Sequence, residues 1–239
     1  MGNDLLQGCV AIVTGGSTGI GFECCRALGE AGAIVILTAR TEADGEKAEK
    51  ELRDEGLHVR FMQQDVSSLS SWQQLCSDIN HEYDRLDFLV NNAGISMLTP
   101  LEEMTPDAFL NIYRINLLGQ WYGLKTCTPH ILASAEKRGF PGAVVNMSSM
   151  LSRIGQAGAI AYCAAKGGLT DLTVAAEEHW AKDKDKIRFR AILPGYTMTP
   201  QVEKAVGREA PLVAELAAKV PLRRWGEAEE IARALMMIV

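Results

Sequence analysis

Short apolar runs recur along the chain and predict a parallel β-sheet. In the first run, Val10 to Val13, hydrophobic residues follow one another without polar alternation. Such runs are typical of strands that are buried on both faces, as the strands of parallel sheets are. The expected strands cover residues 10–13, 33–37, 58–62, 87–90, 142–145 and 187–193.

The stretches between these runs have helical character. Residues 42–55 are rich in Glu, Lys and Ala, and predict an exposed helix. Either Ser67 or Ser68 is expected to cap the following helix. Thr105 is expected to cap one long helix over residues 106 to about 134. Alternating strands and helices indicate an α/β fold: a single doubly wound parallel sheet of Rossmann type, with helices on both faces, in one domain over residues 1–239.

Composition excludes several classes of function. With 239 residues and 47% hydrophobic residues, the chain can build one sizeable core. A net charge of −6 and the lack of a basic cluster argue against a nucleic-acid partner. The sequence has no apolar leader and no apolar run long enough to span a bilayer, so we expect a cytoplasmic protein without membrane contact. The six cysteines and four histidines lack metal-ligand spacing, which predicts reduced thiols and no metal site.

A glycine-rich stretch joins the first strand to the first helix. Glycine permits a tight turn there and lets backbone N–H groups approach a diphosphate at the helix N-terminus. An ordinary glycine-rich turn is the alternative, but the strand–helix–strand unit of about 30 residues favours a dinucleotide site. The candidate cofactor contacts are Gly15, Ser17, Thr18, Gly19, Ile20 and Gly21.

The end of the second strand bears on the choice of cofactor. An acidic residue there would bind the adenosine ribose, but the chain has Ala39 and Arg40. A guanidinium offers several donors to a 2′-phosphate, so NADP(H) is favoured. Arg40 can equally be a solvated loop charge, and NAD(H) therefore remains an alternative.

Tyr162 and Lys166 lie four residues apart in a stretch of helical character, so they share one helical face. A neighbouring ammonium lowers the pKa of a phenol and suits it to proton transfer. The spacing alone also arises by chance. Asn116, which sits among apolar residues of the long predicted helix, fits a catalytic role and a structural one equally well.

Further motifs accompany these residues along the chain. The full set is Thr14-Gly15-(x)3-Gly19-x-Gly21, Asp65-Val66, Asn92-Ala93-Gly94, Asn116, Ser149, Tyr162-(x)3-Lys166, and Pro194-Gly195 with Thr199. Taken together, these motifs closely resemble the short-chain dehydrogenase/reductase family in its compact, ketoreductase-like form. The resemblance covers residues 8–239, and the motifs occur in the family's order.

The resemblance implies an NAD(P)-dependent oxidoreductase that interconverts a ketone and a secondary alcohol. It implies that Tyr162 exchanges a proton with the substrate oxygen and that Lys166 lowers the tyrosine pKa and holds the nicotinamide ribose. Ser149, 13 residues before the tyrosine, would orient the substrate, and Asn116 would anchor a water in a proton relay. The further implied cofactor contacts are Asp65, Val66, Asn92, Ala93, Gly94, Pro194, Gly195, Thr197 and Thr199.

The resemblance also implies a substrate pocket and a lid. The lid is expected over residues 198–220. The expected lining is Ser96, Met97, Leu98, Met150, Leu151, Ile154, Gln156 and Tyr196. This largely apolar set favours a hydrophobic carbonyl compound; a β-ketoacyl thioester, a steroid-like ring and a small cyclic ketone all remain open.

Further expectations concern assembly and the chain end. Members of the family are commonly homo-oligomers, so we expect a dimer or tetramer. Thr18 stands where many NADP-preferring relatives carry a basic residue, which leaves Arg40 alone to favour the phosphate. Relative to the family, the chain is expected to lack a last strand and a C-terminal tail. A dinucleotide-binding sensor without catalysis is the alternative from another functional class.

Overall fold

Six parallel strands form one sheet, in the order β3-β2-β1-β4-β5-β6. The structure is a computed structural model that describes residues 4–239, apart from the side chains of residues 4, 205 and 206. The strands are β1 Val10–Thr14, β2 Ile34–Ala39, β3 Val59–Gln63, β4 Phe88–Asn91, β5 Gly142–Met147 and β6 Ile187–Ile192. All six predicted strands are confirmed. The strand order reverses between β1 and β4, and in such sheets ligands bind beside this point, at the carboxyl ends of the strands.

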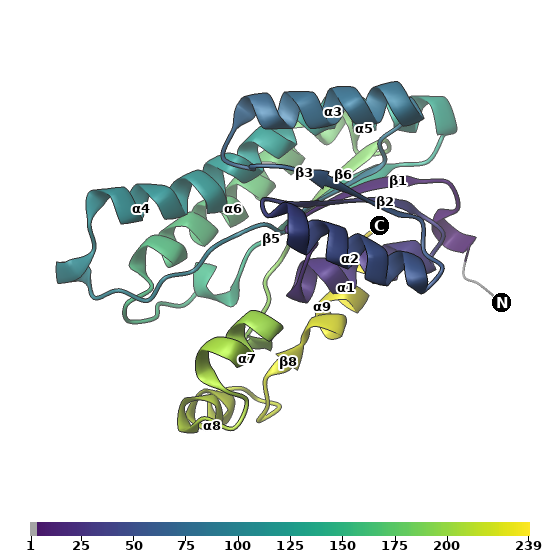
Figure 1. Cartoon of the computed structure of the whole chain (residues 1–239). Coiled ribbons are helices and arrows are strands. Elements are labelled where there is room, and N and C mark those ends of the chain that lie inside the picture. Colours follow the sequence, from purple (N-terminus) through teal and green to yellow (C-terminus); the bar gives the residue numbers. More distant parts are fainter. Residues whose placement is uncertain (1–3) are drawn as a thin grey trace.

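Helices cover both faces of the sheet, which confirms the doubly wound fold (Figure 1). One core lies between the sheet and α1, α2 and α9, with Leu28, Leu52 and Leu235 fully buried. The other core lies under α3, α5 and α6, around Trp72 and Ile131. The helices are α1 Gly19–Glu30, α2 Glu42–Asp54, α3 Leu69–Tyr83, α4 Pro106–Tyr113, α5 Gly119–Arg138, α6 Ile160–His179 and α9 Ala228–Met236.

Capping residues set the helix starts as the sequence predicts. Of the two candidate serines, Ser68 is the cap of α3, and its hydroxyl accepts a hydrogen bond from the Ser71 N–H at 3.2 Å. Thr105 caps α4 by accepting from the Ala108 N–H at 3.2 Å. Gly56 follows the end of α2 with a φ of +87°, a conformation that glycine adopts readily.

The predicted single helix over residues 106–134 is wrong in one respect: a π-helical turn, η3 Arg114–Leu118, interrupts it. Asn116 lies in this wide turn, fully buried. Its amide is paired with the backbone of Ile95, and the Gln120 side chain donates to the Ile115 carbonyl at 3.0 Å. The hydrogen bonds to Ile95 are tertiary contacts, and together with the Gln120 bond they hold a turn that helix propensity alone does not produce. Such π-turns are common at functional sites.

The chain after β6 forms a small lobe beside the sheet (Figure 1). Two short strands, β7 Thr197–Met198 and β8 Gly226–Glu227, pair in parallel at its base. Between them lie α7 Pro200–Val206 and α8 Pro211–Ala218. Within residues 4–239, four 3-10 turns complete the elements: η1 Asp4–Leu6, η2 Leu101–Glu103, η4 Met150–Ser152 and η5 Ala181–Asp183. Over the described residues, no helix has the length and apolarity needed to cross a membrane.

Candidate active site

The glycine-rich stretch forms a tight loop between β1 and α1. Gly15 and Gly19 have φ values of +64° and +59°, which disfavour any side chain. A Cβ added to Gly21 would lie 2.2 Å from the Gly15 carbonyl oxygen, so the helix can approach the loop only with glycine there. No acidic residue lies in the first turn of α1. The loop therefore leaves a cradle at a helix N-terminus that fits the diphosphate of a dinucleotide. Of the other predicted contacts here, Ser17 and Ile20 are half-buried and Thr18 is exposed.

Hydrogen bonds from the end of β4 fix this loop. The Thr14 hydroxyl accepts from the N–H groups of Asn92 and Ala93, both at 3.0 Å. The Asn92 amide donates to the Thr14 and Gly15 carbonyls at 2.9 and 3.2 Å. Asn92 therefore positions the glycine loop. Thr14 opens the glycine motif but was not among the predicted site residues; its place as the last residue of a buried strand was a second signal.

Arg40 and Asp65 lie at the carboxyl ends of neighbouring strands, on the side of β1 away from β4. Arg40 is exposed, and its backbone carbonyl accepts from the Gln63 amide at 3.0 Å. Asp65 is also exposed, and its Oδ1 accepts from the Ser67 N–H and hydroxyl at 2.9 and 2.7 Å. Val66 is buried beside it. These residues stand at the same edge of the sheet as the glycine loop.

Asn116 and Lys166 converge on Gly94. The Asn116 Oδ1 accepts from the Ile95 N–H at 2.8 Å, and its Nδ2 donates to the Ile95 carbonyl at 2.7 Å. A Cβ on Gly94 would lie 3.1 Å from Asn116 Oδ1 and 3.6 Å from Lys166 Nζ. The bare backbone at Gly94 therefore lets the amide and the ammonium come together.

Lys166 is buried and held by one backbone carbonyl. Its Nζ donates to the Met147 carbonyl at 2.6 Å. Burial disfavours the ammonium and lowers the pKa of Lys166 from 10.5 to about 8. A lysine with this pKa can carry or release a proton near neutral pH.

The two neighbouring serines have different surroundings. The Ser148 hydroxyl is engaged with the Lys166 carbonyl at 2.9 Å and with the Thr170 hydroxyl at 2.7 Å, both inside the protein. The Ser149 hydroxyl accepts from the Leu151 N–H at 3.1 Å and also interacts with the Tyr162 phenol. Ser149 is therefore the serine that accompanies the tyrosine.

The Tyr162 phenol has a raised pKa. Burial of the phenol is the main cause; the Ser149 hydroxyl acts in the opposite direction, and a nearby thiol adds a small upward effect. The prediction that Lys166 lowers this pKa is wrong for this arrangement. The Lys166 Nζ lies 5.8 Å from the ring centroid and donates to a backbone carbonyl. The phenol consequently keeps its proton at neutral pH.

A buried polar network supports the site from below. The Asn91 amide donates to Asn146 Oδ1 at 2.8 Å, and the Asn146 amide donates to the Thr173 hydroxyl at 2.8 Å. Gln120 donates to the Ala93 carbonyl at 2.6 Å and so joins the network to the end of β4. Gln120 and Asn91 were not predicted as site residues. A buried amide in a helix or strand of apolar residues was the signal for both.

The segment after β6 contacts both the glycine loop and the residues that follow Ser149. A Cβ on Gly19 would lie 3.1 Å from Thr199 Cγ2, which places Thr199 against the glycine loop. The Thr199 hydroxyl caps α7 by accepting from the Val202 N–H at 3.3 Å. The Pro194 carbonyl accepts from the Met150 N–H at 2.9 Å. Gly195 and Thr197 are joined by a hydrogen bond of 3.1 Å from the Thr197 hydroxyl.

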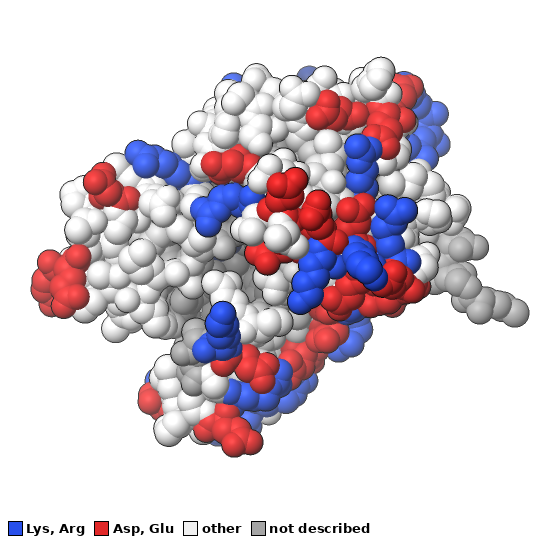
Figure 2. Space-filling model, in the orientation of Figure 1, with Lys and Arg blue, Asp and Glu red and all other residues white. Residues whose placement is uncertain are grey.

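The predicted substrate residues come from three segments that meet at one rim. Thr99 donates its N–H to the Gly158 carbonyl at 2.8 Å, which joins the segment after β4 to the segment before α6. Figure 2 shows the surface hollowed where the lobe of α7 and α8 meets the body. Among the predicted lining residues, Ser96, Met97, Leu98 and Ile154 are exposed, and Met150, Leu151, Gln156 and Tyr196 are half-buried.

Tyr196 belongs to the α7–α8 lobe. Its ring stacks on Trp225 with a centroid distance of 5.3 Å. The Trp225 indole donates to the Val213 carbonyl in α8 at 3.1 Å. Trp225 was not predicted, because nothing in its local sequence indicates a partner 29 residues earlier.

Over the described residues, no group of three or more His, Cys, Asp or Glu side chains could hold a metal ion.

This arrangement suits proton exchange beside a bound dinucleotide. The glycine cradle fits the diphosphate, and Tyr162, Ser149, Lys166 and Asn116 stand at the same edge of the sheet. A nicotinamide cofactor supplies the hydride when bound.

Comparison with known proteins agrees with this geometry. Residues 9–210 match the short chain dehydrogenase family. The cis-4-hydroxycyclohexanecarboxylate dehydrogenase of Sinomonas cyclohexanicum is 36% identical over 230 residues, which are 96% of this chain and 88% of that protein. The NADP-dependent (R)-specific alcohol dehydrogenase of Lentilactobacillus kefiri is 31% identical over 96% of this chain and 88% of its own.

A solved structure agrees as well. The crystal structure of gox2181 superposes with a TM-score of 0.89 at 32% identity, covering 100% of this chain and 91% of that one. The fold, the site and these matches lead to one assignment. The chain belongs to the short-chain dehydrogenase family and is an NAD(P)-dependent oxidoreductase.

Proposed function

We propose that this protein uses NADP(H) to interconvert a ketone and a secondary alcohol, with Tyr162 as the acid and base. The observation that carries the proposal is the convergence of Asn116 and Lys166 on Gly94, beside a tyrosine that interacts with Ser149. A purely structural role for these side chains would not explain why all of these contacts occur together. In contrast, proton transfer next to a bound nicotinamide needs all four side chains.

Each side chain has a task in ketone reduction. The protonated Tyr162 phenol donates its proton to the carbonyl oxygen, and the raised pKa keeps it in the required form. The Ser149 hydroxyl orients the same oxygen. Lys166, with a pKa of about 8, returns a proton to the phenol. Asn116, whose amide holds the Ile95 backbone, stands beside Lys166 at Gly94 and would anchor the water through which protons reach Lys166.

The preference for NADP(H) rests on the end of β2. Ala39 is buried there, so no carboxylate repels a 2′-phosphate, and the exposed Arg40 guanidinium offers donors to it. The NADP-dependent relative from Lentilactobacillus kefiri supports the same choice. A charge-assisted hydrogen bond contributes about 1.5–3 kcal/mol, which corresponds to roughly a tenfold to hundredfold difference in affinity.

The substrate is an apolar ketone or secondary alcohol of modest size. Met97, Leu98 and Ile154 are 40, 64 and 55% exposed at the rim of the site, and an apolar substrate would cover them. The lobe of α7 and α8, within residues 198–220, closes over this rim as a lid. The ring alcohol in the name of the relative from Sinomonas cyclohexanicum favours a cyclic compound.

The test is a ketone panel with each cofactor, on the wild type and on Arg40→Ala, with the remote exposed Arg188→Ala as control. We expect turnover with NADPH above that with NADH, and a kcat/KM for NADPH about tenfold or more lower in Arg40→Ala alone. A wild type that prefers NADH would make the protein an NAD(H) enzyme. Binding of NADPH without turnover of any ketone would favour a sensor.

We also infer a homo-oligomer. Ile160 and Val174 on α6 are 41 and 63% exposed, and Leu118 before α5 is 37% exposed. Apolar side chains in these positions are suited to contacts between copies of the chain.

A further inference from the structure

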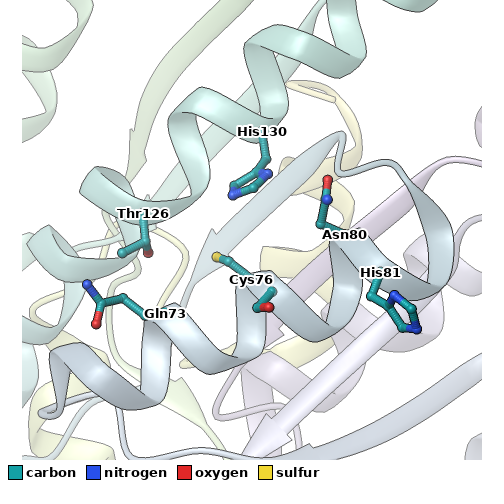
Figure 3. A pocket seen from close by; sticks show the side chains of 7 residues that line it. Gln73, Cys76, Asn80, His81, Thr126 and His130 are labelled. Atoms are coloured by element: carbon teal, nitrogen blue, oxygen red, sulfur yellow. The ribbon is translucent and has the colours of Figure 1, made fainter.

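A groove lies between α3 and α5, and it is formed by residues outside the candidate active site. Its volume is about 540 Å³. Gln73 and Cys76 line it from α3, and Thr126 and His130 line it from α5. Figure 3 shows these side chains around the space between the two helices.

Two thiols meet beside this groove. The Cys76 Sγ on α3 lies 3.3 Å from the Cys127 Sγ on α5, and both cysteines are buried. The two residues are 51 positions apart in the sequence, so the fold alone brings them together. Cys76 lines the groove, whereas Cys127 is 0% exposed. A reagent in the groove therefore reaches Cys76 first and finds a second thiol directly behind it.

The two thiols also differ in acidity. The hydrogen bond from Cys127 lowers the pKa of Cys76 and outweighs the opposing effect of its burial. Burial raises the pKa of Cys127 well above the ordinary value for a thiol. The groove-lining thiol is thus the better nucleophile, because the thiolate is the reactive form. By comparison, burial raises the pKa of Cys24 to about 12.

We propose that Cys76 and Cys127 form a reversible dithiol–disulfide couple, which a small disulfide of the glutathione type oxidises through the α3–α5 groove. The Cys76 thiolate attacks one sulfur of the small disulfide, forms a mixed disulfide and releases one thiolate. Cys127 then loses its proton to water, attacks the Cys76 sulfur and releases the second thiolate. The two protein thiols are oxidised, and the small disulfide is reduced to two thiols.

Oxidation would tie α3 to α5. The closed loop contains β4, the Asn92-Ala93-Gly94 segment and Asn116. Closing a loop removes entropy from the unfolded chain, so the oxidised form should melt at a higher temperature than the reduced form. The inference does not depend on the proposed substrate or cofactor.

The test uses the full chain, fully reduced and then incubated with oxidised glutathione. We expect free thiols to fall from six to four, the intact mass to drop by two hydrogen atoms, and peptide mapping to find a Cys76–Cys127 link that a dithiol reductant reverses. In Cys127→Ser the reaction should stop at a glutathione adduct on Cys76. Cys163→Ser is the control, and it should still form the link.

Three results would overturn the inference. One is six free thiols after prolonged incubation of the folded wild type. Another is a link between a different pair of cysteines. The last is a folded Cys127→Ser that gains no adduct on Cys76. Peptide mapping of the wild type tests the inference by itself, so the test does not depend on the folding of any variant.

Discussion

Replacing Lys166 by Met should stabilise the protein while it abolishes activity. The Lys166 ammonium is buried, and its pKa falls from 10.5 to about 8. At about 1.4 kcal/mol per pKa unit, keeping this lysine charged costs the folded protein roughly 3 kcal/mol at pH 7. Methionine fills a similar volume without charge.

The substitution also removes one hydrogen bond. The Lys166 Nζ donates to the Met147 carbonyl at 2.6 Å, and losing a hydrogen bond from a charged group costs about 1.5–3 kcal/mol. The net gain in the free energy of unfolding is therefore at most about 1.5 kcal/mol at pH 7. For a chain of this length, each kcal/mol shifts Tm by about 2–4 °C, so Tm should rise by at most about 3–6 °C.

The gain should vanish at high pH. The folded-state pKa of Lys166 lies below its unfolded value, so the full penalty applies below pH 8 and disappears as the pH rises through 10.5. Relative to Lys166→Met, the wild type should therefore gain stability between these two pH values.

The assay is calorimetric unfolding of both proteins from pH 7 to pH 10, with the exposed Lys182→Met as the matched control. The variant should lose carbonyl reduction at every pH. A Lys166→Met protein that is less stable than the wild type at pH 7, or a Tm difference that does not shrink as the pH rises, would refute the reasoning.

Three further outcomes are expected. Asp87→Ala should lower the free energy of unfolding by about 3–5 kcal/mol in urea titrations, because it leaves two partly buried arginines without their buried partner; a loss under 1 kcal/mol would contradict this. Gly21→Ala should weaken NADPH binding at least tenfold, measured by fluorescence titration, because its Cβ would meet the Gly15 carbonyl at 2.2 Å; Gly155→Ala, with open space around it, should bind normally. Alcohol oxidation should need a higher pH than ketone reduction, since the raised pKa of Tyr162 makes the phenolate scarce at neutral pH; identical pH–rate profiles would oppose this.

Much of the fold was predictable because its determinants are local. The six strands follow from apolar runs, which are continuous in β1, β2 and β4 and interrupted by arginines in β3 and β6. Thr105 caps a helix by bonding a backbone group only three residues away. The glycine loop was equally predictable, because the spacing of its glycines is set by the backbone turn between β1 and α1. The relation between Ser149 and Tyr162 follows from the order of the motifs.

The rest depends on groups that are distant in the sequence. The π-turn at Asn116 arises from hydrogen bonds to Ile95, 21 residues away. The helix propensities of residues 114–118 do not predict this turn. The pKa of Tyr162 was predicted in the wrong direction, because burial of the phenol is the main effect on it and the Lys166 ammonium donates to a backbone carbonyl instead. The contact between Cys76 and Cys127 spans 51 residues and has no sequence pattern.

The most direct test of the proposed chemistry is the pair of Tyr162→Phe measurements: the rate of NADPH-dependent ketone reduction and the dissociation constant of NADPH. We expect the rate to fall by about 100-fold or more, since proton donation contributes about that much, while the dissociation constant stays within about threefold of the wild type. A Tyr162→Phe protein that reduces the ketone at the wild-type rate would contradict the account.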